Sequence, residues 1–314
     1  MNASGPLILP RERSLQALTN ALQSLVARLE SDPSLIKPDH LRQRLEALDR
    51  LDAYFSSAPA TASSAEPLEP ELYRRARAIF AKLESLNGEL YQVIRSEIQR
   101  GSPPDALLGW VHSLDMDVAG GTANRISYDF PGYNFLDDLI SGVLQFEDPG
   151  SDQISKDPEL VFYQPTPARH IFHLIRLAAL TASDVLFDLG SGLGHVALLA
   201  AICTPARSVG IELEAAYVER ARQCAQTLNL DNVTFIHQDA RAADFSAGTV
   251  FYLYTPFLGS ILSAVLTRLR HEAATRRLCI YAYGPCTSVI ARESWLEAAA
   301  VPEAQRITLF ASRD

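Results

Sequence analysis

The sequence predicts an α/β protein, with an all-helical N-terminal domain followed by a parallel sheet covered by helices on both faces. Apolar residues in the first hundred positions recur every three or four residues, which is the period of an amphipathic helix. From about residue 160, short apolar runs alternate with helical stretches that are long enough for right-handed crossovers. A turn with three glycines follows the first of these runs, and open α/β sheets bind ligands at such turns.

The helical domain is predicted to span residues 1–148. Leu15, Leu18, Leu22, Leu25, Val26 and Leu29 share one helical stripe. A segment rich in Ala, Ser and Pro predicts a linker at 56–70, and residues 101–150 are predicted to be irregular apart from one helix. The helices after the first are predicted at 39–55, 70–100 and 134–144.

The sheet domain is predicted to span residues 149–314, with strand and helix alternating. The run from 250 to 254 is apolar throughout, which is typical of a strand covered on both faces. The tail from 307 to 311 predicts a last strand, antiparallel to 295–300 unless that stretch ends a helix. Strands are predicted at 185–188, 208–212, 233–238, 250–254 and 278–283, and helices at 167–180, 194–202, 215–228 and 259–270.

Composition limits the classes of function. The chain has 314 residues and a formal net charge of −9, which argues against a non-specific nucleic-acid binder that needs Lys and Arg to neutralise phosphates. No secretory leader or membrane span is recognised, which favours a cytoplasmic protein. The four cysteines lack CxxC spacing and are interpreted as buried free thiols, so we predict no metal site.

The strongest local signal is the glycine turn, Asp188-Leu189-Gly190-Ser191-Gly192-Leu193-Gly194. Its glycines let the backbone turn tightly and approach a ligand at the carboxyl edge of the sheet. A dinucleotide fingerprint that starts at Gly190 would need glycine where His195 stands. Asp188 would repel a pyrophosphate, whereas its carboxylate suits the amino group of a methionine moiety. We interpret His195 itself as a helix residue rather than a base.

Acidic residues follow the next two strands. Glu212 can accept hydrogen bonds from both hydroxyls of a ribose. Asp239 is placed to accept from the exocyclic amine of adenine, and Ala240 leaves room for the ring. A carboxylate at a strand end is often only a solvated loop residue, but the preceding glycine turn favours the functional interpretation.

These motifs resemble the cofactor motifs of class I S-adenosylmethionine-dependent methyltransferases, over roughly residues 160 to 285. The resemblance implies a Rossmann-like sheet and S-adenosyl-L-methionine as cofactor. Phe162-Tyr163-Gln164-Pro165-Thr166-Pro167 also resembles the Tyr-x-Pro-Thr-Pro element of a subgroup that includes non-SET lysine methyltransferases. That likeness implies that Tyr163 and Thr166 contact the cofactor, although Thr166 before Pro167 is also a good helix cap. The cofactor-binding set is then Tyr163, Thr166, Asp188, Gly190, Ser191, Gly192, Gly194, Glu212, Asp239 and Ala240.

The methyl acceptor is less clearly indicated. Leu253-Tyr254-Thr255-Pro256-Phe257 stands where such enzymes contact the acceptor, but lacks both the Asn-Pro-Pro-Tyr of amide and adenine methylation and the paired Asn of histone-acting relatives. Hydroxyls and an apolar wall suit an alkyl amine, of a protein lysine or a small molecule. Tyr254 and Tyr133 are the candidate catalytic residues. The candidate acceptor-binding residues are Tyr128, Asp129, Asn134, Thr255 and Phe257.

Methyl transfer from a sulfonium needs little beyond alignment and exclusion of water, so no obligatory base is predicted. The N-terminal domain is expected to cover the site and select the acceptor. Two other functions stay open at this point. One is a nucleotide-dependent oxidoreductase on a similar fold, which His195 disfavours. The other is a non-catalytic cofactor-binding interaction protein, which the intact glycine turn and Glu212 disfavour.

Overall fold

A computed structural model describes residues 10–57, 70–116, 133–146, 159–161 and 163–313. The chain forms two compact units that divide between Val93 and Ile94. This division falls inside the long helix α3 (Pro70–Gln99). The boundary between residues 148 and 149, which was predicted for a cofactor-binding domain, stays a prediction. None of the helices in the described ranges is long and apolar enough to cross a membrane.

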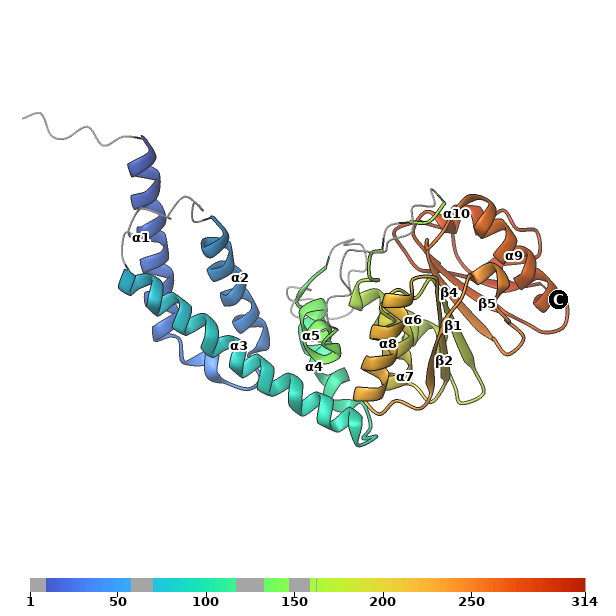
Figure 1. Ribbon diagram of the computed structural model, residues 1–314, viewed down its shortest axis with the longest axis horizontal. Helices are drawn as coiled ribbons and strands as arrows, with labels where there is room; N and C mark the ends of the chain where they lie inside the picture. Colours follow the sequence, from blue (N-terminus) through green and yellow to red (C-terminus); the bar gives the residue numbers. More distant parts are fainter. Residues whose placement is uncertain (1–9, 58–69, 117–132, 147–158, 162, 314) are drawn as a thin grey trace, which may run out of the picture. The chain divides into compact units, whose positions relative to one another are not determined.

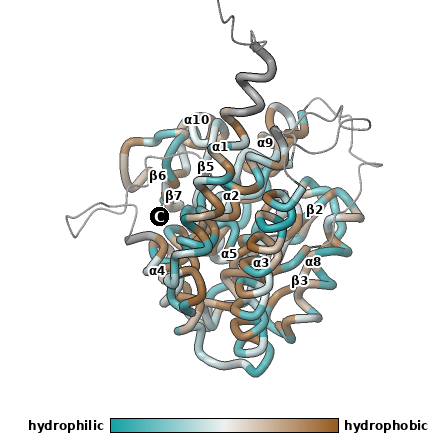
Figure 2. Tube along the Cα trace, turned by 90° about the vertical axis from the view of Figure 1, so that its left-hand side faces the viewer, coloured by the Kyte–Doolittle hydropathy of each residue, from teal (hydrophilic) through white to brown (hydrophobic). Residues whose placement is uncertain are grey.

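The first unit is helical, as predicted. It contains α1 (Pro10–Ser31), the short 3-10 helix η1 (Pro33–Ile36), α2 (Leu41–Ser57) and most of α3. Hydrophobic and hydrophilic positions alternate along these helices (Figure 2). Each of the three helices buries its apolar face against the others, so the apolar stripes meet. One core cluster consists of Leu22, Leu25, Val26, Leu51, Leu72 and Ala76.

The second unit is built on a seven-stranded sheet in the order β3-β2-β1-β4-β5-β7-β6. Strands β1 to β5 are parallel, and β7 pairs antiparallel with both β5 and β6. The predicted strands are thereby confirmed, including the antiparallel tail. The strands are β1 (Val185–Leu189), β2 (Arg207–Glu212), β3 (Val233–His237), β4 (Val250–Tyr254), β5 (Cys279–Tyr283), β6 (Leu296–Ala298) and β7 (Thr308–Ser312).

Helices cover both faces of this sheet (Figure 1). On one face lie α6 (Ala168–Ala178), α7 (His195–Cys203) and α8 (Ala215–Thr227), and on the other lies α9 (Gly259–Ala273). The chain runs from β1 outward to β2 and β3, then returns to β4 on the other side of β1. The strand order therefore reverses between β1 and β4, and α/β sheets bind ligands in the crevice beside this reversal.

Two helices were not expected. The stretch after residue 101 contains α4 (Asp105–Met116), and α10 (Cys286–Ile290) follows β5. Leu107, Val111 and Leu114 of α4 are buried at spacings of four and three. Three apolar positions form only a short stripe, which is why the sequence pattern did not distinguish α4 from irregular chain.

The helix α5 (Phe135–Leu144) is joined to α6 by one carboxylate. Asn134 caps α5 with its side chain, and Asp137 completes a capping box by accepting a hydrogen bond from the backbone N–H of Asn134 at 2.7 Å. The other oxygen of Asp137 accepts from the N–H of Ala168, also at 2.7 Å. One buried side chain therefore satisfies orphan donors at the starts of two helices.

We expect Asp137→Ala to lower the free energy of unfolding by about 1–3 kcal/mol, because two backbone N–H groups lose their acceptor. Urea denaturation followed by circular dichroism measures this effect. Asp138→Ala is the matched control at the next, exposed position, and its effect should stay within about 0.5 kcal/mol. Equal losses in the two variants would contradict the assigned role of Asp137.

Candidate functional site

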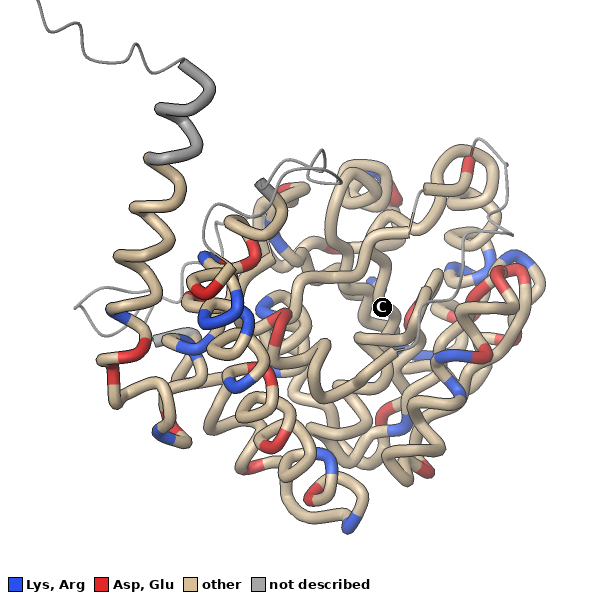
Figure 3. Tube along the Cα trace, turned by 60° about the vertical axis from the view of Figure 1, so that its left-hand side comes forward, with Lys and Arg blue, Asp and Glu red and all other residues tan. Residues whose placement is uncertain are grey.

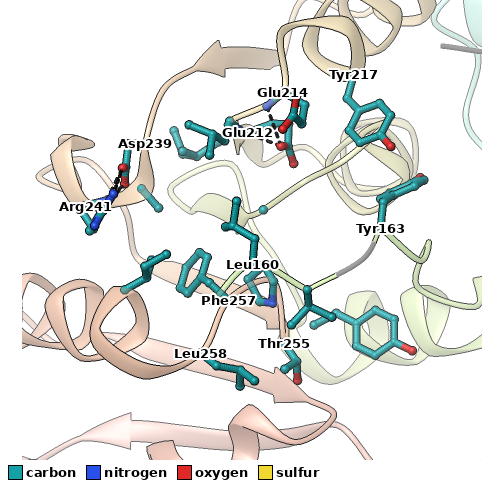
Figure 4. Close-up of a pocket in the computed structure, with 18 of the residues that line it drawn as sticks. Leu160, Tyr163, Glu212, Glu214, Tyr217, Asp239, Arg241, Thr255, Phe257 and Leu258 are labelled. Atoms are coloured by element: carbon teal, nitrogen blue, oxygen red, sulfur yellow. Dashed lines mark hydrogen bonds and ion pairs between the residues drawn. The ribbon is translucent and has the colours of Figure 1, made fainter. Parts of the chain in front are cut away.

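A cavity of about 480 Å³ opens at the carboxyl edge of the sheet, beside the reversal between β1 and β4. Tyr163 and Tyr217 lie together on one side of it, and Asp239 and Arg241 lie on the opposite side (Figure 4). Its walls come from the ends of four strands and from the chain segment before α6. Eight predicted site residues line this cavity, namely Tyr163, Gly190, Glu212, Asp239, Ala240, Tyr254, Thr255 and Phe257.

Each glycine of the turn after β1 lets the backbone lie close to a different neighbouring side chain. Gly190, Gly192 and Gly194 have φ of 75°, 53° and 83°, a region that favours glycine. A Cβ on Gly190 would lie 2.1 Å from Cβ of Pro256, and a Cβ on Gly192 would lie 2.0 Å from Cε2 of Tyr163. At Gly194 the clash would be with Phe235 at 2.4 Å. The turn therefore brings bare backbone against β4 and against the segment before α6.

Asp188 lies near the end of β1 and is almost completely buried. Burial raises the pKa of its carboxyl to about 8, and the nearby carboxylate of Glu212 raises it further in the same direction. A protonated acid at neutral pH ionises most readily when a cation approaches it. Asp188 is thus suited to a positively charged group of a ligand.

Glu212 ends β2 and points back to the glycine turn. Its Oε2 accepts from the N–H of Gly192 at 2.7 Å, and its Oε1 accepts from the N–H groups of Leu213 and Glu214 at 2.7 and 2.9 Å. Burial raises the pKa of Glu212, and these three hydrogen bonds oppose that shift. The carboxylate is therefore fixed in direction at the wall of the cavity, where hydroxyl donors can reach its remaining lone pairs.

The glycine turn also holds a polar atom without a partner. Ser191 is buried, and its Oγ has no hydrogen-bond partner among the residues that the structure describes. Leaving a buried hydroxyl unpaired costs free energy. A polar group of a bound ligand is one way to satisfy it.

Asp239 forms an ion pair on the far side of the cavity. It accepts hydrogen bonds from the backbone and the guanidinium of Arg241, which keep the pKa of its carboxyl below its ordinary value. The ion pair lies at the cavity wall, with Asp239 next to the buried Ala240 (Figure 4). The adenine contact expected of Asp239 stays a prediction, and it would have to coexist with this ion pair.

The two residues expected before α6 have different surroundings. Tyr163 lies over Gly192 and lines the cavity. Thr166 is buried, and its hydroxyl pairs with that of Tyr252 at 3.1 Å. Thr166 is not the cap of α6, because Pro167 takes the capping position without a side-chain bond and Asp137 supplies the acceptor instead.

Three aromatic rings stack outward from the cavity at the ends of β4 and β5. Tyr254 lines the cavity and stacks on Tyr283 with ring centroids 4.7 Å apart, and Tyr283 stacks on His170 at 4.5 Å. The hydroxyl of Tyr283 also meets Nε2 of His170 at 3.1 Å. Burial lowers the pKa of His170 to about 4, so its ring is neutral near pH 7, and burial raises the pKa of Tyr254. Tyr283 and His170 are buried behind Tyr254, and the buried guanidinium of Arg169 acts on the pKa of both.

Other residues predicted to bind the acceptor mainly hold local structure. Thr255 has φ of 40°, which is strained for a β-branched residue, and its hydroxyl donates to the carbonyl of Tyr283 and accepts from the N–H of Cys286. Phe257 is buried at the cavity wall. Asn134 caps α5. Tyr128 and Asp129 lie outside the described residues, and the acceptor contacts of all five stay predictions.

Tyr133 is half-exposed, and its hydroxyl donates to the carbonyl of Pro165 at 2.8 Å. Desolvation raises the pKa of this phenol, and the phenols of Tyr254 and Tyr283 act in the same direction. Sequence reasoning missed Tyr217, His170, Tyr252 and Tyr283. Tyr252 and Tyr283 lie in strands whose apolar patterns predict only core, so no local signal marked them.

The fold is Rossmann-like, and its cavity opens at the end of β1, where sheets of this kind bind ligands. Residues 180–251 match a family model described as a methyltransferase domain, and this range contains the glycine turn, Glu212 and Asp239. No match is found among curated proteins. Residues 180–251 of the second unit are therefore similar to a methyltransferase domain, and the enzyme uses S-adenosylmethionine as its methyl donor.

Several solved structures are similar to part of the chain. An RNA methyltransferase from Salinibacter ruber, in complex with S-adenosyl-L-homocysteine, is 28% identical and is matched over 48% of this chain and 92% of its own, with a TM-score of 0.39. A putative methyltransferase from Escherichia coli is 18% identical over 46% and 87%, with a TM-score of 0.39. A putative S-adenosyl-L-methionine-dependent methyltransferase from Methanococcus maripaludis is 12% identical over 46% and 83%, with a TM-score of 0.38.

The residues at the cavity fit this cofactor. Glu212 at the cavity wall offers acceptors for ribose hydroxyls, and the buried Asp188 behind the wall offers a carboxyl for the ammonium group. The bare backbone of Gly190 and Gly192 lets Pro256 and Tyr163 close the wall beside them. The unpaired Ser191 hydroxyl adds a polar contact. When bound, S-adenosylmethionine supplies an electrophilic methyl group on a sulfonium. The individual contacts stay predictions that substitution can test.

We expect Gly192→Ala to weaken S-adenosylmethionine binding at least about tenfold, because its Cβ would collide with the Tyr163 ring and its φ is positive. Isothermal titration calorimetry measures the dissociation constant. Gly88→Ala is the matched control, since a Cβ there meets nothing within 4 Å and helix α3 gains a better helix former. Unchanged binding in Gly192→Ala would overturn the role assigned to the turn.

The raised pKa of Asp188 predicts a specific pH dependence. Between about pH 4 and 8 the folded state holds a proton that the unfolded state has lost, so stability contributed by this group falls as pH rises through that window. Cofactor binding favours the ionised carboxylate, so affinity should rise toward pH 8 with release of a proton. Calorimetry at pH 7 in buffers of different ionisation enthalpy detects the proton. Asp188→Asn should bind more weakly and abolish the release, and an unchanged proton count in Asp188→Asn would contradict the assignment.

Proposed function

We propose that the enzyme transfers the methyl group to an amine nitrogen, of a protein lysine or of a small molecule. The observation that carries this proposal is the ring of Tyr254 at the cavity wall, which packs against the buried ring of Tyr283. An aromatic ring at the wall accommodates an alkyl chain and attracts a methylated ammonium product through cation–π contact.

Proton balance also favours an amine acceptor over an already anionic one. An amine enters mostly as an ammonium ion and must release one proton to solvent before its lone pair can take the methyl group. The new N–C bond then replaces the S–C bond of the sulfonium, which leaves as the neutral thioether. Desolvation next to the Tyr254 ring favours the neutral amine. The phenols of Tyr254 and Tyr133 are placed at this side of the site, and we propose that their oxygens orient the nitrogen by accepting its N–H hydrogen bonds.

The subgroup resemblance adds the lysine side chain to this proposal. The Tyr163 to Pro167 element lies at the cavity with Tyr163 over the glycine turn, which supports a shared way of holding the cofactor. The segment after β4 differs from that of the relatives that act on histones. The resemblance therefore does not indicate which protein is the target. We further propose that the N-terminal helices select the acceptor and that the enzyme acts in the cytoplasm.

A nucleic-acid acceptor is the main competing outcome. Along the described helices, Lys and Arg are interspersed with Asp and Glu (Figure 3), and the net charge is −9. A protein that binds phosphates by charge concentrates basic residues on one surface. This distribution supports a protein or small-molecule acceptor.

Incubation of cell lysate with methyl-labelled cofactor tests the proposal, followed by separation of protein, nucleic-acid and small-molecule fractions. Label on lysine or on an amine metabolite is expected. Tyr254→Phe should lower the turnover of that acceptor about tenfold, with cofactor affinity unchanged. Tyr281→Phe is the matched control, since its hydroxyl reaches only the carbonyl of Leu177 at 3.4 Å. Label confined to nucleic acid would overturn the amine acceptor.

A further inference from the structure

The side chain of Tyr163 packs against several residues at the edge of the cofactor cavity. Its ring fills the space over Gly192 where a Cβ would collide with it, and it packs on Tyr217 with ring centroids 4.9 Å apart. Both tyrosines line the cavity (Figure 4). The ring therefore forms part of the wall that faces the ligand, and its orientation sets the width of the cavity at the glycine turn.

The hydroxyl of Tyr163 ends between the turn and α7. Nδ1 of His195 lies 3.4 Å from its oxygen. Burial raises the pKa of this phenol, and the backbone of Leu193 acts against that rise. Burial lowers the pKa of His195 to about 4, so the imidazole is neutral near pH 7. The phenol donates to Nδ1 when the imidazole hydrogen is on Nε2, because Nδ1 then has a free lone pair.

The imidazole of His195 is held in turn from the end of α5. Phe146 follows this helix, and its ring centroid lies 4.7 Å from that of His195. α5 is thus tied to the cofactor-binding half at both ends, by Asp137 to the start of α6 and by Phe146 to the start of α7. Glycine at position 195, as in a dinucleotide turn, could make neither contact.

We infer that His195 is a positioning residue for the cofactor. It holds the Tyr163 hydroxyl so that the ring stays over Gly192, and Phe146 links this arrangement to α5. The inference extends our interpretation of His195 as a helix residue rather than a base, since His195 begins α7. It rests on the use of S-adenosylmethionine and on no property of the acceptor, so it stands or falls independently of the amine proposal.

A double-mutant cycle measured by calorimetry with S-adenosylmethionine alone tests the inference. Tyr163→Phe and His195→Leu should each weaken binding about three- to tenfold, which corresponds to the loss of one hydrogen bond. The double variant should bind no more weakly than either single variant, because both changes remove the same contact. His195→Gln should restore most of the affinity, since its amide oxygen can accept from the phenol.

Two results would overturn the inference, namely unchanged affinity in His195→Leu, or losses that multiply in the double variant. His173→Leu is the matched control, because His173 of α6 is also a partly buried, neutral histidine, and its Nδ1 contacts Arg176. Circular dichroism reports whether each variant folds. If His195→Leu does not fold, His195→Gln and the shorter His195→Asn replace it, and equal affinities of those two variants would overturn the inference.

Discussion

The site depends on the close approach of bare backbone at the glycine turn to two other segments. Gly190 lies against Pro256 after β4, and Gly192 lies under the ring of Tyr163. These contacts bring the end of β1, the end of β4 and the segment before α6 to one cavity. A side chain at either glycine would separate them, so the geometry of the cavity follows from two missing Cβ atoms.

Electrostatics adds a second constraint at the same turn. Asp188 and Glu212 are two carboxyls that are largely removed from water and whose negative charges would repel each other. The pKa values of both are raised. Such a pair is unfavourable in isolation and becomes favourable when a cation and hydroxyl donors arrive together. A cofactor that carries an ammonium group and a ribose supplies both. The free site therefore has a built-in preference for the ligand that its fold family uses.

The cofactor half of the site was predictable because its chemistry resides in contiguous motifs at strand ends, where Asp188 to Gly194 and Glu212 can be recognised by spacing. The strands and the antiparallel tail followed from alternation and strand length. Helix α4 was missed because three buried residues make a weak stripe. Tyr283 and His170 were missed because their stack joins residues 113 positions apart, and a tyrosine in an apolar strand looks like core.

This contrast has a physical origin. The predicted cofactor contacts come from the backbone and two carboxylates, so their signature is local and depends on glycine and acid at fixed spacing. The acceptor side is formed by rings and phenols that come from α6, β4, β5 and the start of α5. No single segment contains that pattern, and only the fold brings it together. His195 combines a local signal with distant contacts. Its position next to the glycine turn can be read from the sequence, whereas its contacts to Tyr163 and Phe146 come from segments distant in the chain.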